Sequence, residues 1–108
     1  MSLKNVNIID GKEPDLSGNL IFYLEDELEW NENKEKEHLL LLQDKLNTYL
    51  SYIQRGDYKK DYPAYNFRQA IIEIKFHYNI TEHCKRYLQL VQRQIEEYAI
   101  KLEVYVLK

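Results

Sequence analysis

The strongest pattern along the chain is helical. From position 39 to position 53, apolar residues recur at steps of three and four: Leu39, Leu42, Leu46, Tyr49 or Leu50, and Ile53. Steps of this size place side chains on one face of a helix, and Lys45 falls on the polar side. Asn31 or Asn33 is a candidate N-cap, and Arg55-Gly56 is a C-terminal stop signal. The sequence therefore predicts a helix that packs on a core through a leucine-rich face.

A second helical pattern follows Thr81, which is a candidate N-cap. Its apolar positions are Cys84, Tyr87 or Leu88, Val91, Ile95, and Tyr98 or Ala99. Because these positions again share one face, the pattern predicts a second helix with one covered side.

A period of two marks residues 67–78 and 100–107. Alternate residues of a strand point to opposite faces, so this period indicates a strand with one covered face. The expected covered positions are Ala70, Ile72, Ile74, Phe76 and Tyr78, followed by Ile100, Leu102, Val104 and Val106. Residues 5–11 and 20–30 are rich in strand formers, and the turn-forming residues 12–19 separate them. This arrangement predicts a β-hairpin with a long loop.

The order of the expected elements is β-β-α-β-α-β. One-sided strands and helices predict an α+β fold, a two-layer sandwich of about four strands with two helices on one face. Strand order is left open by these patterns. The length of 108 residues suits one domain, which we assign to residues 5–108. Residues 1–4 are interpreted as a cloning remnant or a disordered start.

Composition and charge narrow the function. The net charge of −3 argues against general nucleic-acid binding, because neutralisation of phosphates by Lys and Arg supplies that affinity. The single cysteine, Cys84, excludes an internal disulfide and fits a reducing compartment. No apolar run approaches the roughly 18 residues that a membrane-spanning helix needs. We therefore expect a cytoplasmic protein without a membrane segment.

The residues that could carry chemistry lack the spacing that chemistry requires. His38, His77 and His83 are scattered, without the H-E-x-x-H pattern of a zinc site, and we expect them to be exposed or capping. Cys84 lies in an apolar stripe, which favours a core position over a nucleophile. The acidic run at 25–37 is typical of a solvated surface. We expect no catalytic residue, no metal, no cofactor and no enzymatic activity.

The most informative segment is 52–69, where aromatic and basic residues alternate. Tyrosine and arginine are enriched where proteins bind proteins, and we assign the candidate surface to Tyr58, Tyr62, Tyr65 and Arg68, with Trp30 as a possible neighbour. The same loop, 55–68, could also stack single-stranded bases. A third interpretation is that the tyrosines fold back and cover the end of the core.

Four segments together resemble a family of small bacterial proteins of unknown function. They are "NIID", "LEDELEW", "EHLLLLQDKLNTYLSYIQRGD" and "DYPAYNFRQAIIEIKFHY", which carry a leucine-rich helix and a Tyr-Pro loop. The resemblance covers residues 5–107, but "EEYAIKLEVY" lacks the glycine expected after the second helix. It implies one compact domain and no particular reaction, cofactor or partner.

These observations favour a non-enzymatic protein-interaction or self-associating module of the bacterial cytoplasm. The expected partner is an unidentified protein or a second copy of the chain. The alternative is single-stranded nucleic-acid binding through the loop 55–68, and a small metal-dependent hydrolase is a remote third. The sequence specifies neither the partner, the biological process nor the oligomeric state.

Overall fold

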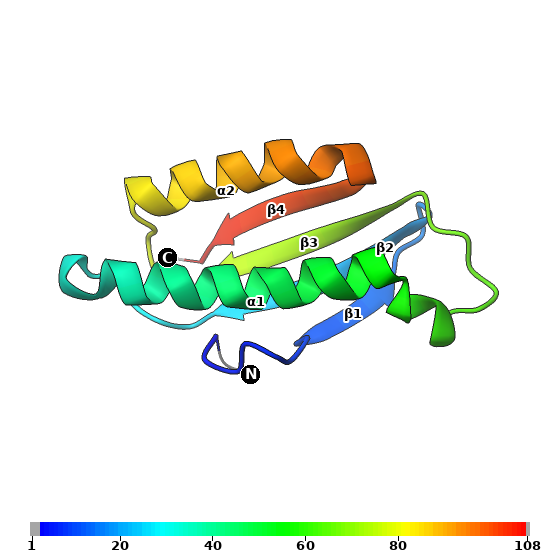
Figure 1. Cartoon of the computed structure of the whole chain (residues 1–108), viewed down its shortest axis with the longest axis horizontal. Helices are drawn as coiled ribbons and strands as arrows, with labels where there is room; N and C mark the ends of the chain where they lie inside the picture. Colours follow the sequence, from blue (N-terminus) through cyan, green and yellow to red (C-terminus); the bar gives the residue numbers. More distant parts are fainter. Residues whose placement is uncertain (1–2, 108) are drawn as a thin grey trace.

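Among residues 3–107, which the computed structural model describes, four strands form one mixed sheet (Figure 1). The strands are β1 (Gly11–Pro14), β2 (Asn19–Asp26), β3 (Gln69–Phe76) and β4 (Ile100–Val106). They lie in the order β1-β2-β3-β4, with β1 antiparallel to β2 and with β2, β3 and β4 parallel to one another. Strand order in the sheet therefore follows chain order.

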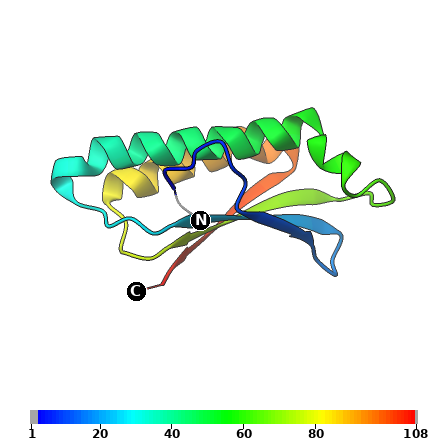
Figure 2. The ribbon, with the colours of Figure 1, turned by 90° about the horizontal axis from the view of Figure 1, so that it is seen from below.

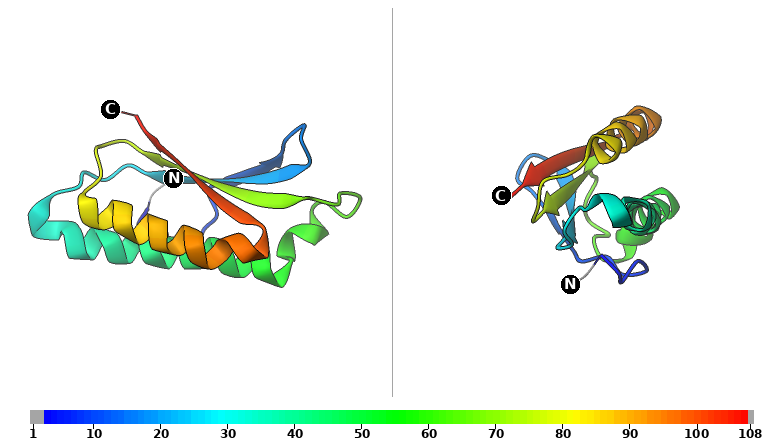
Figure 3. Two further views of the ribbon diagram at one scale, coloured as in Figure 1. Left: turned by 90° about the horizontal axis from the view of Figure 1, so that it is seen from above. Right: turned by 90° about the vertical axis from the view of Figure 1, so that its left-hand side faces the viewer.

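Helices α1 (Glu35–Arg55) and α2 (Glu82–Ile95) connect the parallel strands and cover the same face of the sheet (Figure 2). Short 3₁₀ turns lie at the helix ends: η1 (Glu32–Lys34), η2 (Asp57–Lys60) and η3 (Glu96–Tyr98). The end-on view in Figure 3 shows the two layers, with the helices on one side and the sheet on the other. The predicted α+β sandwich with element order β-β-α-β-α-β is confirmed.

The helix ends follow the capping signals in the sequence. The Asn31 side chain accepts a hydrogen bond from the Asn33 N–H at 2.9 Å and so caps the turn that leads into α1. Gly56 ends α1 with φ of 74°, a left-handed conformation that favours glycine. At α2, the Thr81 hydroxyl accepts from the Cys84 N–H at 3.2 Å. Local sequence therefore determines both helix starts and the end of α1.

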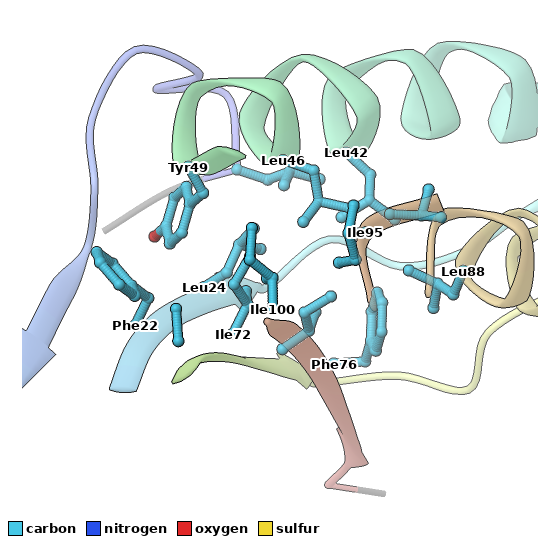
Figure 4. Close-up of a cluster of buried hydrophobic side chains, with 14 of the residues drawn as sticks. Phe22, Leu24, Leu42, Leu46, Tyr49, Ile72, Phe76, Leu88, Ile95 and Ile100 are labelled. Atoms are coloured by element: carbon cyan, nitrogen blue, oxygen red, sulfur yellow. The ribbon is translucent and has the colours of Figure 1, made fainter. Parts of the chain in front are cut away.

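The core lies between the two layers and follows the alternation of the central strands. β2 and β3 contribute Leu20, Phe22, Leu24, Ala70, Ile72, Ile74 and Phe76. The helices contribute Leu42, Leu46, Tyr49, Cys84, Leu88, Val91 and Ile95 (Figure 4). Each large apolar side chain buried in this way contributes about 1.5–3 kcal/mol to folding.

The predicted covered face is wrong beyond the end of β3 and in the second half of β4. Val104 and Val106 are each 40% exposed, and Tyr78 is also exposed. Tyr78 lies beyond the end of β3, and the second half of β4 turns away from the helix layer (Figure 3). Apolar alternation predicts which face a residue occupies, but it does not predict how far the other layer extends over that face.

The first strand is also displaced from its predicted position. Residues 5–10 contain no strand; β1 begins at Gly11, the last residue of the predicted strand, and its other residues fall in the stretch 12–19 expected as a turn. The turn is shorter because the Asp15 carboxylate accepts hydrogen bonds from the Ser17 and Asn19 N–H groups, both at 2.9 Å. The hairpin therefore closes tightly around Gly18, leaving the segment before β1 free for another contact.

That preceding segment packs beside α1. Leu3 is fully buried, and the Thr48 hydroxyl donates to the Val6 carbonyl at 2.6 Å. Of the four residues expected as a cloning remnant or a disordered start, Met1 and Ser2 lie outside the described residues, while Leu3 belongs to the core. Within the described residues, the chain thus contributes to the core from Leu3 onward.

The prediction that Lys45 lies on the polar, solvent-facing side of α1 is wrong. It is 0% exposed, and its ammonium donates to Asp10 Oδ1 at 2.7 Å and to the Asn5 carbonyl at 3.4 Å. The other oxygen of Asp10 accepts from the Glu25 N–H at 3.0 Å. A buried cation is tolerated when it is paired and hydrogen-bonded, and this one joins the N-terminal segment, α1 and β2.

Ala99 occupies the position where the sequence lacks the expected glycine, and it adopts φ of 58°. Because this left-handed conformation strains a residue with a Cβ atom, we predict that Ala99→Gly stabilises the protein by about 0.5–1 kcal/mol. Thermal unfolding should show a rise of a few degrees in Tm. The matched control is Ala64→Gly, since Ala64 is an exposed turn residue without positive φ. Equal decreases in Tm for both variants would contradict the prediction.

Candidate functional site

Four aromatic rings gather in the connection between α1 and β3. The ring of Phe67 lies 6.0 Å from Tyr58, 5.8 Å from Tyr62 and 5.2 Å from Tyr65, measured between centroids. Tyr62 and Tyr65 are 5.6 Å apart in an edge-to-face arrangement. We refer to these four residues as the aromatic cluster. Gly56 and the turn η2 fold the chain back so that the rings meet.

The aromatic cluster both covers the core and presents a surface. Tyr58, Tyr62 and Phe67 are partly buried against the core, while Tyr65 is 57% exposed. The structure thus combines two interpretations of the loop that the sequence leaves open. Most of its rings close the end of the core, and one ring faces solvent with its neighbours beneath it.

A hollow lies beside the aromatic cluster at the same end of the sheet. It has a volume of about 430 Å³ and is lined by Ile53, Gln54, Tyr58, Tyr98 and Ile100. We call it the end groove. Its walls come from the last turns of α1, from η2, from η3 and from the start of β4, and Tyr98 is 57% exposed. Its volume lies within the range of pockets that hold ligands or side chains of a partner.

A smaller hollow connects the end groove with the aromatic cluster. It has a volume of about 90 Å³, and Tyr58, Tyr98, Phe67 and Arg68 are among its lining residues. Arg68 also donates to the Ser17 carbonyl at 3.4 Å, which holds its side chain against the hairpin turn. Tyr58, Tyr62, Tyr65 and Arg68, the residues assigned from the sequence, therefore lie together around one surface.

Some charges near this surface are neutralised and others are not. Asp57 pairs with Arg55 at 2.7 Å, and Asp61 pairs with Lys12 at 2.9 Å. The hydrogen bond from Asp61 raises the pKa of Lys12, and Lys12 in turn lowers the pKa of Asp61. Within the described part of the chain, three further cations form no ion pair: Lys59, Lys60 and Arg68. These three cations form a basic rim on the side of the aromatic cluster, whereas the exposed acids Glu96 and Glu97 precede Tyr98 in η3 at the end groove.

Trp30 does not belong to this surface, so its place as a neighbour of the tyrosines is wrong. Its indole N–H donates to Asp26 at 3.2 Å, and Asp26 ends β2, whereas the aromatic cluster lies beyond Asn19, which starts β2. A strand rises about 3.3 Å per residue, so these ends are about 23 Å apart. Figure 1 shows the α1–β3 connection and the start of α1 at opposite ends of the molecule.

The far end of β2 holds a buried polar cluster that the sequence patterns miss. Asp26 is fully buried and accepts hydrogen bonds from His38 at 2.7 Å, from the Leu28 N–H at 3.0 Å and from Trp30. The rings of Trp30 and His38 stack with centroids 3.6 Å apart. His38 is buried, which corrects the expectation that it is exposed or capping. The cluster joins the end of β2 to the first turn of α1.

An Asp–His pair is also part of a catalytic triad, which needs a nucleophile as its third member. Cys84 is the nearby thiol, and burial together with the charge of Asp26 raises its pKa to about 12. It is fully buried, as its place in the apolar stripe predicts. Because only the thiolate is a good nucleophile, the arrangement favours a structural role for Asp26, His38 and Cys84.

The two other histidines each contact a carboxylate near the surface. His77 contacts Glu25 and His83 contacts Glu35, both at 2.9 Å. Within residues 3–107, no three His, Cys, Asp or Glu side chains are arranged to hold a metal ion. On the uncovered sheet face, burial and the neighbouring Glu103 raise the pKa of Glu73.

Sequence reasoning misses part of the end groove. Ile53 and Tyr98 stand in apolar stripes and therefore resemble core residues, while Gln54 has no distinguishing neighbour. These residues meet only because the last turn of α1 and η3, which follows α2, lie at the same end of the sheet. No local signal could have placed them beside Tyr58.

Fold and surface together define a small two-layer α+β domain with a hollow, lined in part by tyrosine rings, at one end of the sheet. The chain belongs to a family of unknown function, DUF6572, whose model matches residues 1–108. No curated protein and no solved structure matches the chain. In the described residues, neither helix has the length and apolar character needed to cross a membrane.

The raised pKa of Cys84 leads to a prediction about its reactivity. With a pKa of about 12, only about one thiol in 10⁴ is ionised at pH 8, so a thiol reagent should modify the folded protein very slowly. After addition of denaturant, one thiol per chain should react rapidly. The measurement is absorbance-monitored thiol titration. Rapid modification of the folded protein would show that this thiol is accessible and ionised.

Proposed function

We propose that this protein is a non-enzymatic module that binds another protein through the end groove, the aromatic cluster and the basic rim. The observation that carries the proposal is the convergence of Tyr58, Tyr98 and Ile53 from separate elements around one hollow. Tyrosine and arginine supply much of the energy of protein interfaces, especially around a pocket that excludes water. The single free Cys84 supports a location in a reducing compartment such as the cytoplasm.

The chemistry of the surface indicates the kind of partner. The hollow is large enough for an apolar or aromatic side chain, and Tyr98 lines one side of it. Lys59, Lys60 and Arg68 would attract acidic residues, because complementary charge increases the association rate. We therefore propose a partner segment in which an apolar anchor is flanked by Asp or Glu.

Single-stranded nucleic acid is the alternative ligand for the same loop. The exposed ring of Tyr65, stacked on Phe67 at 5.2 Å, and the adjacent cations support it. Two features favour a protein partner instead: Ile53 and Ile100 supply an apolar part of the lining of the hollow, and the net charge is −3. The two ligands differ in salt dependence, since binding to phosphates weakens steeply as salt is added.

Exposed residues of the surface give a direct test. We predict that Tyr98→Ser and Arg68→Ala each weaken partner binding by about 10-fold or more, the loss typical of an interface hot spot. The matched controls are Tyr78→Ser and Arg86→Ala, because Tyr78 and Arg86 are exposed residues of the same types far from the groove. Tagged protein would capture partners from nuclease-treated lysate of the source organism, and calorimetry would then measure the affinity of the recovered partner.

The outcomes separate the proposals. Equal affinity for the surface variants and their controls would place the binding site elsewhere. Loss of all partners after nuclease treatment, together with salt-sensitive binding of oligothymidine, would favour the nucleic-acid alternative. Circular dichroism of each variant would show whether the fold is retained.

A further inference from the structure

Strand β4 forms one edge of the sheet, and its backbone groups divide into two sets. Leu107 donates to the Phe76 carbonyl at 2.8 Å, and Ala70 donates to the Ala99 carbonyl at 3.0 Å. The odd-numbered residues of β4 therefore direct their N–H and C=O groups toward β3. Because successive residues of a strand direct these groups to opposite sides, the even-numbered residues direct theirs to the open edge.

A side chain from α2 closes the first half of this edge. Gln92 accepts from the Leu102 N–H at 2.6 Å and donates to the Ile100 carbonyl at 3.4 Å. Its amide thus takes the place that a peptide group of a neighbouring strand would occupy. Covering an edge in this way is a common protection against pairing with another chain.

The second half of the edge is not closed. In the described chain, the outward N–H and C=O groups of Val104 and Val106 have no hydrogen-bond partner. Figures 2 and 3 show this part of β4 leaving the helix layer. The opposite edge of the sheet is less suited to pairing with another strand, because β1 has only four residues and ends in Pro14, which has no N–H group.

An apolar groove of about 270 Å³ lies beside the open half of β4, between β4 and α2. Its apolar walls are Ile80, Leu88, Leu102 and Val104. The valines at 104 and 106 are each 40% exposed on this side of the sheet. Open backbone groups and uncovered apolar side chains therefore occur at the same place.

We propose that the open half of β4 pairs antiparallel with the same segment of a second copy, around a two-fold axis at Tyr105. In this register each Val104 lies opposite Val106 of the other copy and exchanges two backbone hydrogen bonds with it. All four open groups of each copy are used, and both Gln92 contacts remain. A register centred on Val104 would instead need the Leu102 N–H, which Gln92 already holds.

A second copy fits this edge because the edge is self-complementary. An isologous contact requires a surface that matches itself after a two-fold rotation, and two adjacent valines with open donors and acceptors do so. Their side chains face the helix layer on both copies, so Val106 of one copy enters the apolar groove of the other. On the uncovered face, the two Tyr105 rings become direct cross-strand neighbours.

This contact leaves the proposed partner-binding surface free. Val106 pairs with Phe76 at one end of the sheet, whereas Ile100 lines the end groove at the other. A dimer joined at Tyr105 therefore carries two end grooves that point away from the contact. It would bind a partner with two copies of the acidic-apolar segment more tightly than a single domain would.

The first test is the oligomeric state. We predict a dimer whose fraction rises with concentration in sedimentation velocity, because the contact is at the small end of protein interfaces. Val106→Lys should give a monomer, since a charge that points inward protects a sheet edge. Leu90→Lys, at an exposed leucine of α2 outside the groove, should dimerise like the unaltered protein. A monomer at every soluble concentration, or a Val106→Lys variant that still dimerises, would overturn the proposal.

The second test addresses the register and does not depend on the strength of the dimer. In a Cys84→Ala background, Tyr105→Cys should form a disulfide between copies under mild oxidation, because directly opposite Cβ atoms lie about 4.5–5.5 Å apart. Glu103→Cys is the matched control on the same face, and it lies opposite Leu107 in this register. Efficient linkage through position 105 alone supports the register, whereas no linkage or equal linkage at both positions overturns it.

Discussion

The buried ion pair between Lys45 and Asp10 constrains much of this structure. Lys45 extends from the inner face of α1 into a region without water, so a carboxylate has to meet it there. Asp10 does so, and its second oxygen and its N–H contact Glu25 and Tyr49. Tyr49 in turn donates to the Tyr23 carbonyl. Removing one member of such a pair leaves an uncompensated charge and costs about 3–5 kcal/mol, so α1, β2 and the N-terminal segment hold one relative position.

The position of α1 then determines where the hollow surface forms. The helix is held at Lys45 and again at His38, which contacts Asp26 at the end of β2. With both contacts in place, its last turns extend over the start of β2 and β3, where Ile53 meets Tyr98 of η3. The end groove is therefore a consequence of how the helices are placed on the sheet.

Fold class and element order were predictable because they depend on apolar periodicity, which is local. The failures are residues whose environment depends on a distant partner. Lys45 and His38 are polar residues that are buried because each pairs with a carboxylate. Their partners are distant in the sequence: Asp10 lies 35 residues from Lys45, and Asp26 lies 12 residues from His38. The tyrosines and Arg68 lie close together, as their neighbouring places in one connection predict. Trp30 lies far from the tyrosines, because it follows the opposite end of β2. The residue type of Trp30 does not indicate at which end of the sheet it lies.

The two ends of the domain achieve different chemistry with similar residue types. At one end, Trp30 stacks on His38 and its N–H is satisfied by a buried carboxylate, so that aromatic ring stabilises the fold. At the other end, Tyr65 and Tyr98 are exposed, and the neighbouring cations lack ion pairs. The stability of the fold does not require either feature. Exposed rings and unpaired charges add little to folding but much to binding. The same reasoning applies to β4, where Gln92 protects half of the edge and two valines leave the rest uncovered. An edge that is selectively open in this way is better explained by a partner strand than by incomplete protection.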